Sequence, residues 1–406
     1  MSEMKGRLSF YIMLPVIVQF AMFYLCFNVT SEMFFYSLFY GGSIFFLVCF
    51  FELLFRKKIN YTSLYDNVYN NIAPIDKFVL KLLGFFVIAL FPLDVYFNGF
   101  KLLNPATYAE FYGVGRFIRH VTTMCWMLVP IAYIIRAKNP WVARLFIVCS
   151  ILLPIMMIDR NRLLMSFFSY FVILYARFRS HTIRTRPGEF RRVKFGLYSL
   201  LILLPTIFVI IGFYRSGTSF SIDSSGDRII YGKFPLTDFF EMMPPSFKQI
   251  LLYITSPILN FTHVASTGFL NDQFLLSQIS PFSRDAYPVY PFSPVLIVRF
   301  NVGTEFYPFL LYGGLPYVFI AMFFVVLTFS VVFYWFCKSQ GVYAWLLFLK
   351  FAYLMLFLGF APQFYILFNF MSVVLIFILY LFSAFLKFSM PVNTGKTSLG
   401  GGSDRK

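Results

Sequence analysis

Arginines at the ends of apolar segments are the residues of this chain best placed to do chemistry. Arg160 and Arg162 stand just before one apolar run, Arg215 follows another, and Arg299 precedes a third. A guanidinium is a planar, permanently charged fork that matches phosphate oxygens in paired hydrogen bonds. An arginine within a bilayer costs about 2.5–3.5 kcal/mol at the centre and less near the surface, so a phosphate partner would offset this cost. The placement therefore favours a pocket for a lipid-linked phosphate at the level of the headgroups.

A simpler explanation exists for each arginine taken alone. Its side chain could reach ordinary phospholipid headgroups, or pair with a nearby acid, as Arg160 could with Asp159. For one arginine the two explanations are equally good. Their recurrence at several segment ends, with Arg116 and Arg119 as further examples, favours a shared role.

The composition indicates which elements must hold these arginines. Of 406 residues, 59% are hydrophobic and 13% are charged, whereas soluble domains are about 45–50% apolar and ~25% charged. With a mean hydropathy of +0.75, the chain is predicted to be an all-α polytopic membrane protein. Basic residues cluster at the ends of apolar segments, so membrane topology explains the net charge of +17, and nucleic-acid binding is not expected.

Apolar runs of the length that a helix needs to cross ~30 Å of hydrocarbon recur along the chain. They predict about ten transmembrane helices in a single integral membrane domain, residues 1–390, followed by a disordered cytoplasmic tail, residues 391–406. The run 306–336 is unusually long, which indicates a late start or a break near Gly313, Gly314 and Pro316. The expected spans are 8–27, 33–55, 78–97, 121–135, 142–158, 163–178, 195–213, 306–336, 342–360 and 364–385.

Residues 214–305 form one large loop that is neither continuously apolar nor a short charged connector. Lys and Arg are in excess in the short connectors on one side of the membrane, which predicts that this side and both termini are cytoplasmic and that the large loop lies outside. Within it, residues 248–266 are apolar but interrupted by Ser256 and Pro257. This pattern favours a re-entrant or surface-lying pair of short helices, because a further span would reverse the charge bias of every later connector. A true span with inverted topology after it is the alternative.

No metal or cofactor is expected. The five cysteines lie in or beside apolar runs without ligand spacing, and the three histidines are far apart in sequence. The loop has no Asp-x-Asp pair, which argues against a glycosyltransferase that holds a nucleotide-sugar through a divalent ion. Motifs of the Gly-x-Ser-x-Gly type are absent from the sequence as well.

Residues 159–310 resemble the bacterial oligosaccharide repeat-unit polymerases, the O-antigen polymerases of the Wzy type. The similarity lies in four short stretches taken in order: Asp159 to Leu163, Arg215 to Gly217, Tyr253 to Phe261, and Asn301 to Phe306 followed by a Gly-rich span start. The third reads Tyr-x-x-Ser-Pro-Ile-x-x-Phe and the fourth Asn-Val-Gly-Thr-x-Phe.

The resemblance implies a GT-C-like helical enzyme of the bacterial inner membrane with its active site on the periplasmic face. Such enzymes move a growing glycan from its undecaprenyl diphosphate carrier to the non-reducing end of a repeat unit on a second carrier. The implied partners are these lipid-linked glycans, membrane lipids and a chain-length regulator, with no nucleic acid.

The resemblance also implies roles for individual residues. Arg160, Arg162, Arg215 and Arg299 become ligands of the diphosphate, with the last two as the catalytic pair, since the main need is to stabilise charge on the leaving group. Glu305 is the first candidate for the general base and His263 the second, although either could be structural. Further substrate contacts are expected from Arg116, Arg284, Tyr253, Asn301 and Thr304.

Two other functions stay open. A lipid-linked oligosaccharide flippase or another transporter would also be polytopic and basic, but internal repeats and ionisable residues near the span midplanes would be expected. In this chain Glu52, Asp94 and Lys350 are the notable charges within spans. An O-antigen ligase, whose acceptor is lipid A core, would share most of these features, and the Asn-Val-Gly-Thr stretch favours the polymerase.

Overall fold

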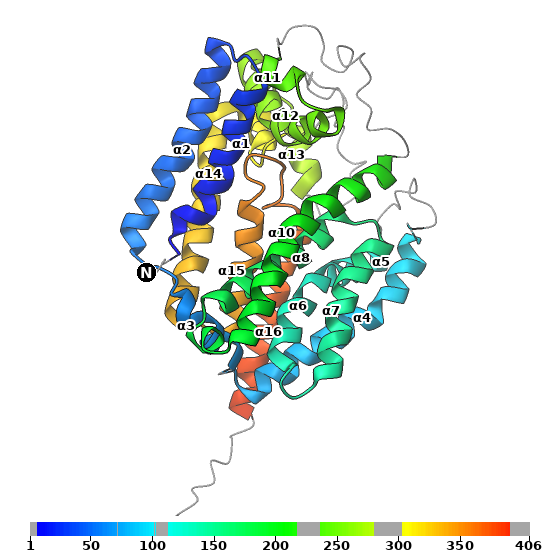
Figure 1. Ribbon diagram of the computed structural model, residues 1–406. Helices are drawn as coiled ribbons and strands as arrows, with labels where there is room; N and C mark the ends of the chain where they lie inside the picture. Colours follow the sequence, from blue (N-terminus) through cyan, green and yellow to red (C-terminus); the bar gives the residue numbers. More distant parts are fainter. Residues whose placement is uncertain are drawn as a thin grey trace, which may run out of the picture.

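The computed structural model describes residues 6–70, 72–100, 102, 113–216, 236–279 and 303–389. In these ranges the chain is almost entirely helical, with two isolated bridges and no β-strand (Figure 1). The prediction of an all-α protein is therefore confirmed for the part that is described. The predicted tail, residues 391–406, lies outside it.

Six segments within these ranges are long and apolar enough to cross a membrane. Many of their large apolar side chains are exposed, such as Phe46 and Leu53, which suits contact with lipid. The expectation of about ten spans adds four helices that are shorter or carry charge near their ends, and it stays a prediction. The six segments are α1 (Leu8–Cys26), α2 (Ser31–Phe55), α4 (Pro74–Asn98), the run Phe117–Ile135, α14 (Tyr307–Ser339) and the part Asn369–Ser389 of α16. The four additional helices are α7 (Pro140–Met156), α8 (Arg160–Arg179), α10 (Pro187–Ser216) and α15 (Val342–Met355).

The core includes α15, which packs mainly against α14 and α16, and the run made of α5, η2 and α6, which packs mainly against α4, α7 and α8. Every residue of α15 is buried, and so is every residue of α6 (Leu128–Ile135). A helix that is apolar on all sides gains from contacts on all sides, so it lies inside the bundle and not at its edge. The buried Trp345 satisfies its indole N–H by donating to the Tyr69 hydroxyl at 2.7 Å. The segments of the run are α5 (Gly113–Thr122), the 3₁₀ helix η2 (Thr123–Met127) and α6.

The break that the sequence predicts in the long segment 306–336 is confirmed. Gly313 has φ −162° and ψ 24°, and Gly314 has φ 76° and ψ −164°, so the backbone of α14 leaves the helical region at both residues. The positive φ of Gly314 is a conformation that residues with a Cβ rarely adopt. Pro316 follows, and because proline has no backbone N–H it suits the first turn of the resumed helix.

The predicted pair of short helices over 248–266 is wrong. These residues form one helix, α12 (Pro245–Thr267), which continues through Pro257 and ends at Gly268 with φ 64°. A proline inside a helix costs about 3 kcal/mol, whereas each fully buried Leu or Ile side chain contributes roughly 1.5–3 kcal/mol. Leu252, Ile258 and Leu259 are buried against the end of α1, so packing on both sides of the proline keeps the helix continuous.

The remaining helices are short and lie at the ends of the long ones. α11 (Asp238–Glu241), α12 and α13 (Asp272–Ile279) gather where α1 ends and α14 begins (Figure 1). Backbone hydrogen bonds fasten them there, from Thr237 N to Cys26 O at 3.2 Å and from Asn271 N to Leu311 O at 2.7 Å. Away from this group lie α3 (Tyr61–Tyr65), the π-helix η1 (Asp66–Asn70) and α9 (His181–Arg184).

Candidate functional site

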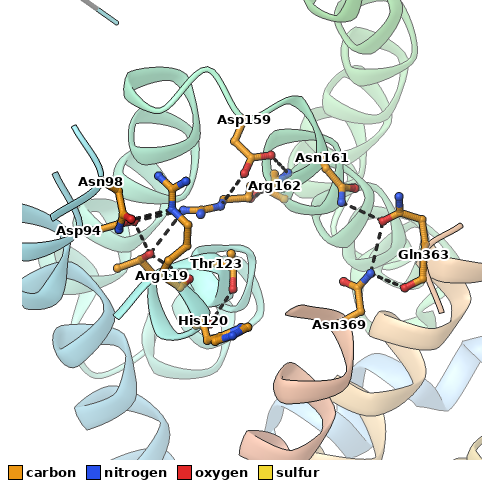
Figure 2. Close-up of polar contacts among 12 residues, drawn as sticks. Asp94, Asn98, Arg119, His120, Thr123, Asp159, Asn161, Arg162, Gln363 and Asn369 are labelled. Carbon is orange, nitrogen blue, oxygen red and sulfur yellow. Dashed lines mark hydrogen bonds and ion pairs between the residues drawn. The ribbon is translucent and has the colours of Figure 1, made fainter. Parts of the chain in front are cut away.

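A buried cluster of charged side chains joins the end of α4 to α5 and to the start of α8 (Figure 2). Asp94 is fully buried. Its Oδ1 lies 3.1 Å from Nε of Arg119, and its Oδ2 lies 3.7 Å from Nη1 of Arg162. The same carboxylate accepts hydrogen bonds from Thr122 Oγ1 at 2.5 Å and Asn98 Nδ2 at 2.7 Å. One acid therefore holds two buried guanidiniums in a setting of low dielectric, where such contacts are strong.

Asp159 fixes Arg162 from the other side. Its side chain accepts from the backbone N of Arg162 at 3.1 Å, which caps the first turn of α8, and its Oδ2 lies 2.8 Å from Nε of the same residue. A cap of this kind stabilises a helix start by satisfying an N–H group that has no partner within the helix. Arg162 is thus held in one place by two carboxylates from different parts of the chain.

Glu305, the first candidate for the general base, is fully buried just before α14. Its Oε2 accepts from the backbone N of Gln363 at 2.6 Å, and its Oε1 accepts from the backbone N of Phe364 at 2.8 Å. Burial raises the pKa of this carboxyl well above its usual range, while the two N–H donors lower it. Since both oxygens are occupied by the backbone, the geometry favours a role as anchor of the loop 356–366 over proton transfer.

The loop 356–366, which connects α15 to α16 (Leu367–Ser389), is the centre of a polar network. Asn161 Nδ2 donates to Gln363 Oε1 at 3.1 Å, and Asn369 Nδ2 donates to the backbone O of Gln363 at 2.6 Å (Figure 2). On α15, Lys350 Nζ donates to Asn369 Oδ1 at 2.7 Å, and the Tyr353 hydroxyl donates to the backbone O of Asn161 at 2.9 Å. The network ends at the first turn of α8, beside Arg162.

Two more residues predicted from the sequence adjoin this loop. The ring of Tyr253, on α12, lies with its centroid 4.8 Å from that of Phe360. Thr304 is buried immediately before Glu305. Tyr40 lies near Thr304 and Glu305, and its hydroxyl donates to the backbone O of Leu358.

His263, the second candidate for the general base, is half-buried on α12, and burial lowers its pKa. Lowering favours the neutral imidazole, the form that can accept a proton near pH 7. Among the described residues, no hydrogen bond or ion pair joins His263 to Glu305 or Arg162. The two candidate bases are therefore not in direct polar contact.

The other predicted site residues are only partly placed. Arg116 is in α5, Arg160 is the first residue of α8, and Arg215 is in the last turn of α10. The side chains of these three arginines are not described. Arg284, Arg299 and Asn301 lie outside the described residues.

The partners that organise the site were not predicted from the sequence. Asp94 and Lys350 carried a signal, since a charged residue within an apolar run is costly and tends to serve a function. Asn161 and Gln363 carried none, because polar residues in short connectors are common, and Asn369 was a single uncharged residue within an expected span. Arg119 was recognised only as one more arginine at a segment end.

The fold is a helical bundle in which six described segments are long and apolar enough to cross a membrane, and a buried polar centre lies where several helices end. No protein-family model matches the chain, and no significant match was found among curated proteins or among solved structures.

Proposed function

We propose that this protein polymerises undecaprenyl-diphosphate-linked oligosaccharide repeat units of O-antigen or a related surface polysaccharide. It transfers the growing glycan from one lipid diphosphate carrier to the non-reducing end of a repeat unit on another. In this proposal the fold is GT-C-like, the protein lies in the bacterial inner membrane with both termini in the cytoplasm, and the active site faces the periplasm. A chain-length regulator is a further partner, and no metal or cofactor takes part.

The observation that carries the proposal is the buried cluster in which carboxylates hold the guanidiniums of Arg119 on α5 and Arg162 at the start of α8. A leaving diphosphate gains negative charge, and groups fixed in advance stabilise that charge without reorganising. Arg119 and Arg162 face Asp94 and Asp159, so the described charges of the cluster balance. Direct contacts to a diphosphate then need further cations. Within our proposal these are Arg116, Arg160, Arg215, Arg284 and Arg299, and Arg162 positions the start of α8.

The acceptor hydroxyl needs a base, and the two candidates differ. His263 has a lowered pKa and is neutral near pH 7, so it can accept a proton. Both oxygens of Glu305 already accept backbone hydrogen bonds. We assign the proton transfer to His263 and the support of the loop 356–366 to Glu305.

The direct test is synthesis by the purified full-length protein. Given undecaprenyl-diphosphate-linked repeat units in lipid vesicles, it is expected to form products with two or more repeats, at the same rate with and without a chelator. Loss of product on chelation, restored by magnesium or manganese, would assign the reaction to a metal-dependent glycosyltransferase. Product formed only with lipid A core as acceptor would indicate the ligase, and lipid movement without a new glycosidic bond would indicate the transporter.

The orientation in the membrane is tested by two cysteine substitutions at exposed positions. Ser266→Cys on α12 is expected to react with a membrane-impermeant thiol reagent in intact spheroplasts, whereas Gly188→Cys at the start of α10 should react only after lysis. A Cβ at Gly188 meets no atom within 4 Å, so this substitution should not disturb packing. The unsubstituted protein is the control for its native cysteines. Reaction of Gly188→Cys alone in intact cells would overturn the proposed orientation and the site with it.

A further inference from the structure

The hydrogen bonds around Gln363 have a direction that is set by Lys350. In its ammonium form Lys350 donates and cannot accept, and its Nζ lies 2.7 Å from the amide oxygen of Asn369. The amide nitrogen of Asn369 then points to Gln363, where it lies 2.6 Å from the backbone O and 3.3 Å from Oε1. One cation therefore removes the usual ambiguity in the orientation of these amides.

A second contact, with Asn161, agrees with this orientation of the Gln363 side chain. Asn161 Nδ2 also donates to Gln363 Oε1, at 3.1 Å, and the Tyr353 hydroxyl contacts Asn161 from α15. Gln363 Oε1 thus accepts from two amides, which fills both of its lone pairs. Turning the Gln363 amide over would place N–H against N–H at the contact with Asn369. Its amino group, Nε2, is consequently fixed on the opposite side.

Among the described residues, no hydrogen bond occupies the Gln363 amino group. Gln363 is half-buried and Asn161 is exposed, so the pair lies at the surface of the polar network. Lys350 and Asn369, which set the orientation, are buried. A buried cation hydrogen-bonded to a neutral amide costs free energy that an apolar side chain would not, which is typical of residues kept for function.

We infer that Gln363 Nε2 donates a hydrogen bond to a phosphate oxygen of the lipid carrier, with Lys350 and Tyr353 as positioning residues. This inference rests on the proposed function. The amino group of Gln363 can only donate hydrogen bonds, and a diphosphate oxygen can only accept them. A sugar hydroxyl would also need an acceptor for its own O–H. Gln363 also lies one hydrogen bond from Asn161, the residue between Arg160 and Arg162.

Gln363→Glu tests the inference, because it replaces the donor by an anionic acceptor of the same shape. Undecaprenyl diphosphate without a glycan is the probe, and its Kd for the purified protein is measured by titration calorimetry in detergent. The Kd is expected to rise at least about tenfold, since hydrogen bonds to charged groups are among the stronger ones. Gln363→Met, which removes the donor without adding charge, should raise it by a smaller factor. Gln273→Glu, the same change on α13, should leave it unchanged.

Lys350→Met tests the positioning role. It should leave the thermal unfolding temperature unchanged or raise it, because a buried charge is removed, and yet it should raise the Kd for undecaprenyl diphosphate. In the Gln363→Met background it should have no further effect on Kd, since the two residues act through one hydrogen bond. Independent, additive effects would overturn the positioning role.

The outcomes separate the inference from the proposed function. If the unsubstituted protein does not bind undecaprenyl diphosphate, the proposed function is overturned and the inference with it. If the unsubstituted protein binds, and Gln363→Glu has a normal unfolding temperature and binds equally well, only the inference is overturned. In that case the amide meets a sugar or no substrate at all.

Discussion

Asp94→Ala is expected to lower the free energy of unfolding by about 3–5 kcal/mol, because it leaves two buried guanidiniums without their shared carboxylate. Arg119 and Arg162 are both buried, so neither can turn to water without opening the contacts between α4, α5 and α8. The measurement is denaturant unfolding of the purified protein in detergent, supported by the amount of folded protein in membranes.

Two comparisons show what this loss means. Asp272→Ala removes an exposed carboxylate on α13 and should change stability by less than about 0.5 kcal/mol. The combined change Asp94→Leu, Arg119→Met and Arg162→Met removes all three charges, and well-packed apolar replacements of buried ion pairs are often neutral or stabilising. We expect this variant to fold and to lack polymerase activity. If Asp94→Ala lowers the free energy of unfolding by less than about 1 kcal/mol, the cluster is not important for stability. If the combined variant makes normal glycan chains, the cluster has no part in the mechanism.

Arg215→Ala and Arg299→Ala are each expected to lower polymerisation by about 10²–10³-fold, by analogy with the loss of one donor to a transition-state anion. The two residues stand at the two ends of the loop 214–305, so a compact loop could bring both guanidiniums to one diphosphate. Replacement by lysine keeps the charge but removes the planar fork, and it should be nearly as harmful. Glycan chain length in cells is the measurement: lipid capped by a single repeat unit is expected in place of a ladder.

The comparison for this pair is Arg184→Ala, at matched protein level. Arg184 is an exposed arginine of α9, far from the polar network in the chain, and its loss should leave the ladder normal. A normal ladder from both Arg215→Ala and Arg299→Ala would mean that these arginines meet only phospholipid headgroups.

Local chemistry let the sequence determine several features of this protein. The apolar runs determined a helical membrane protein, since only helices of that length satisfy their own backbone in hydrocarbon. Gly313, Gly314 and Pro316 determined the break in α14, because backbone freedom and a missing N–H act within one turn. The helix α8 begins at Arg160, ahead of the expected span 163–178, because Asp159 caps its first turn.

Contacts between distant segments decided the rest. Pro257 is locally a helix breaker, and only packing against α1 shows why α12 continues through it. Asp94 contacts arginines of α5 and α8, and Glu305 and Asn161 contact the loop that holds Gln363. These residues are far apart in sequence, and no sequence pattern predicts that they meet. The physical reason is that α6, and α15 apart from Lys350, are apolar on every side, so their periodicity favours no face and no neighbour. Which polar groups meet then depends on how the helices pack, and that is decided by the tertiary structure alone.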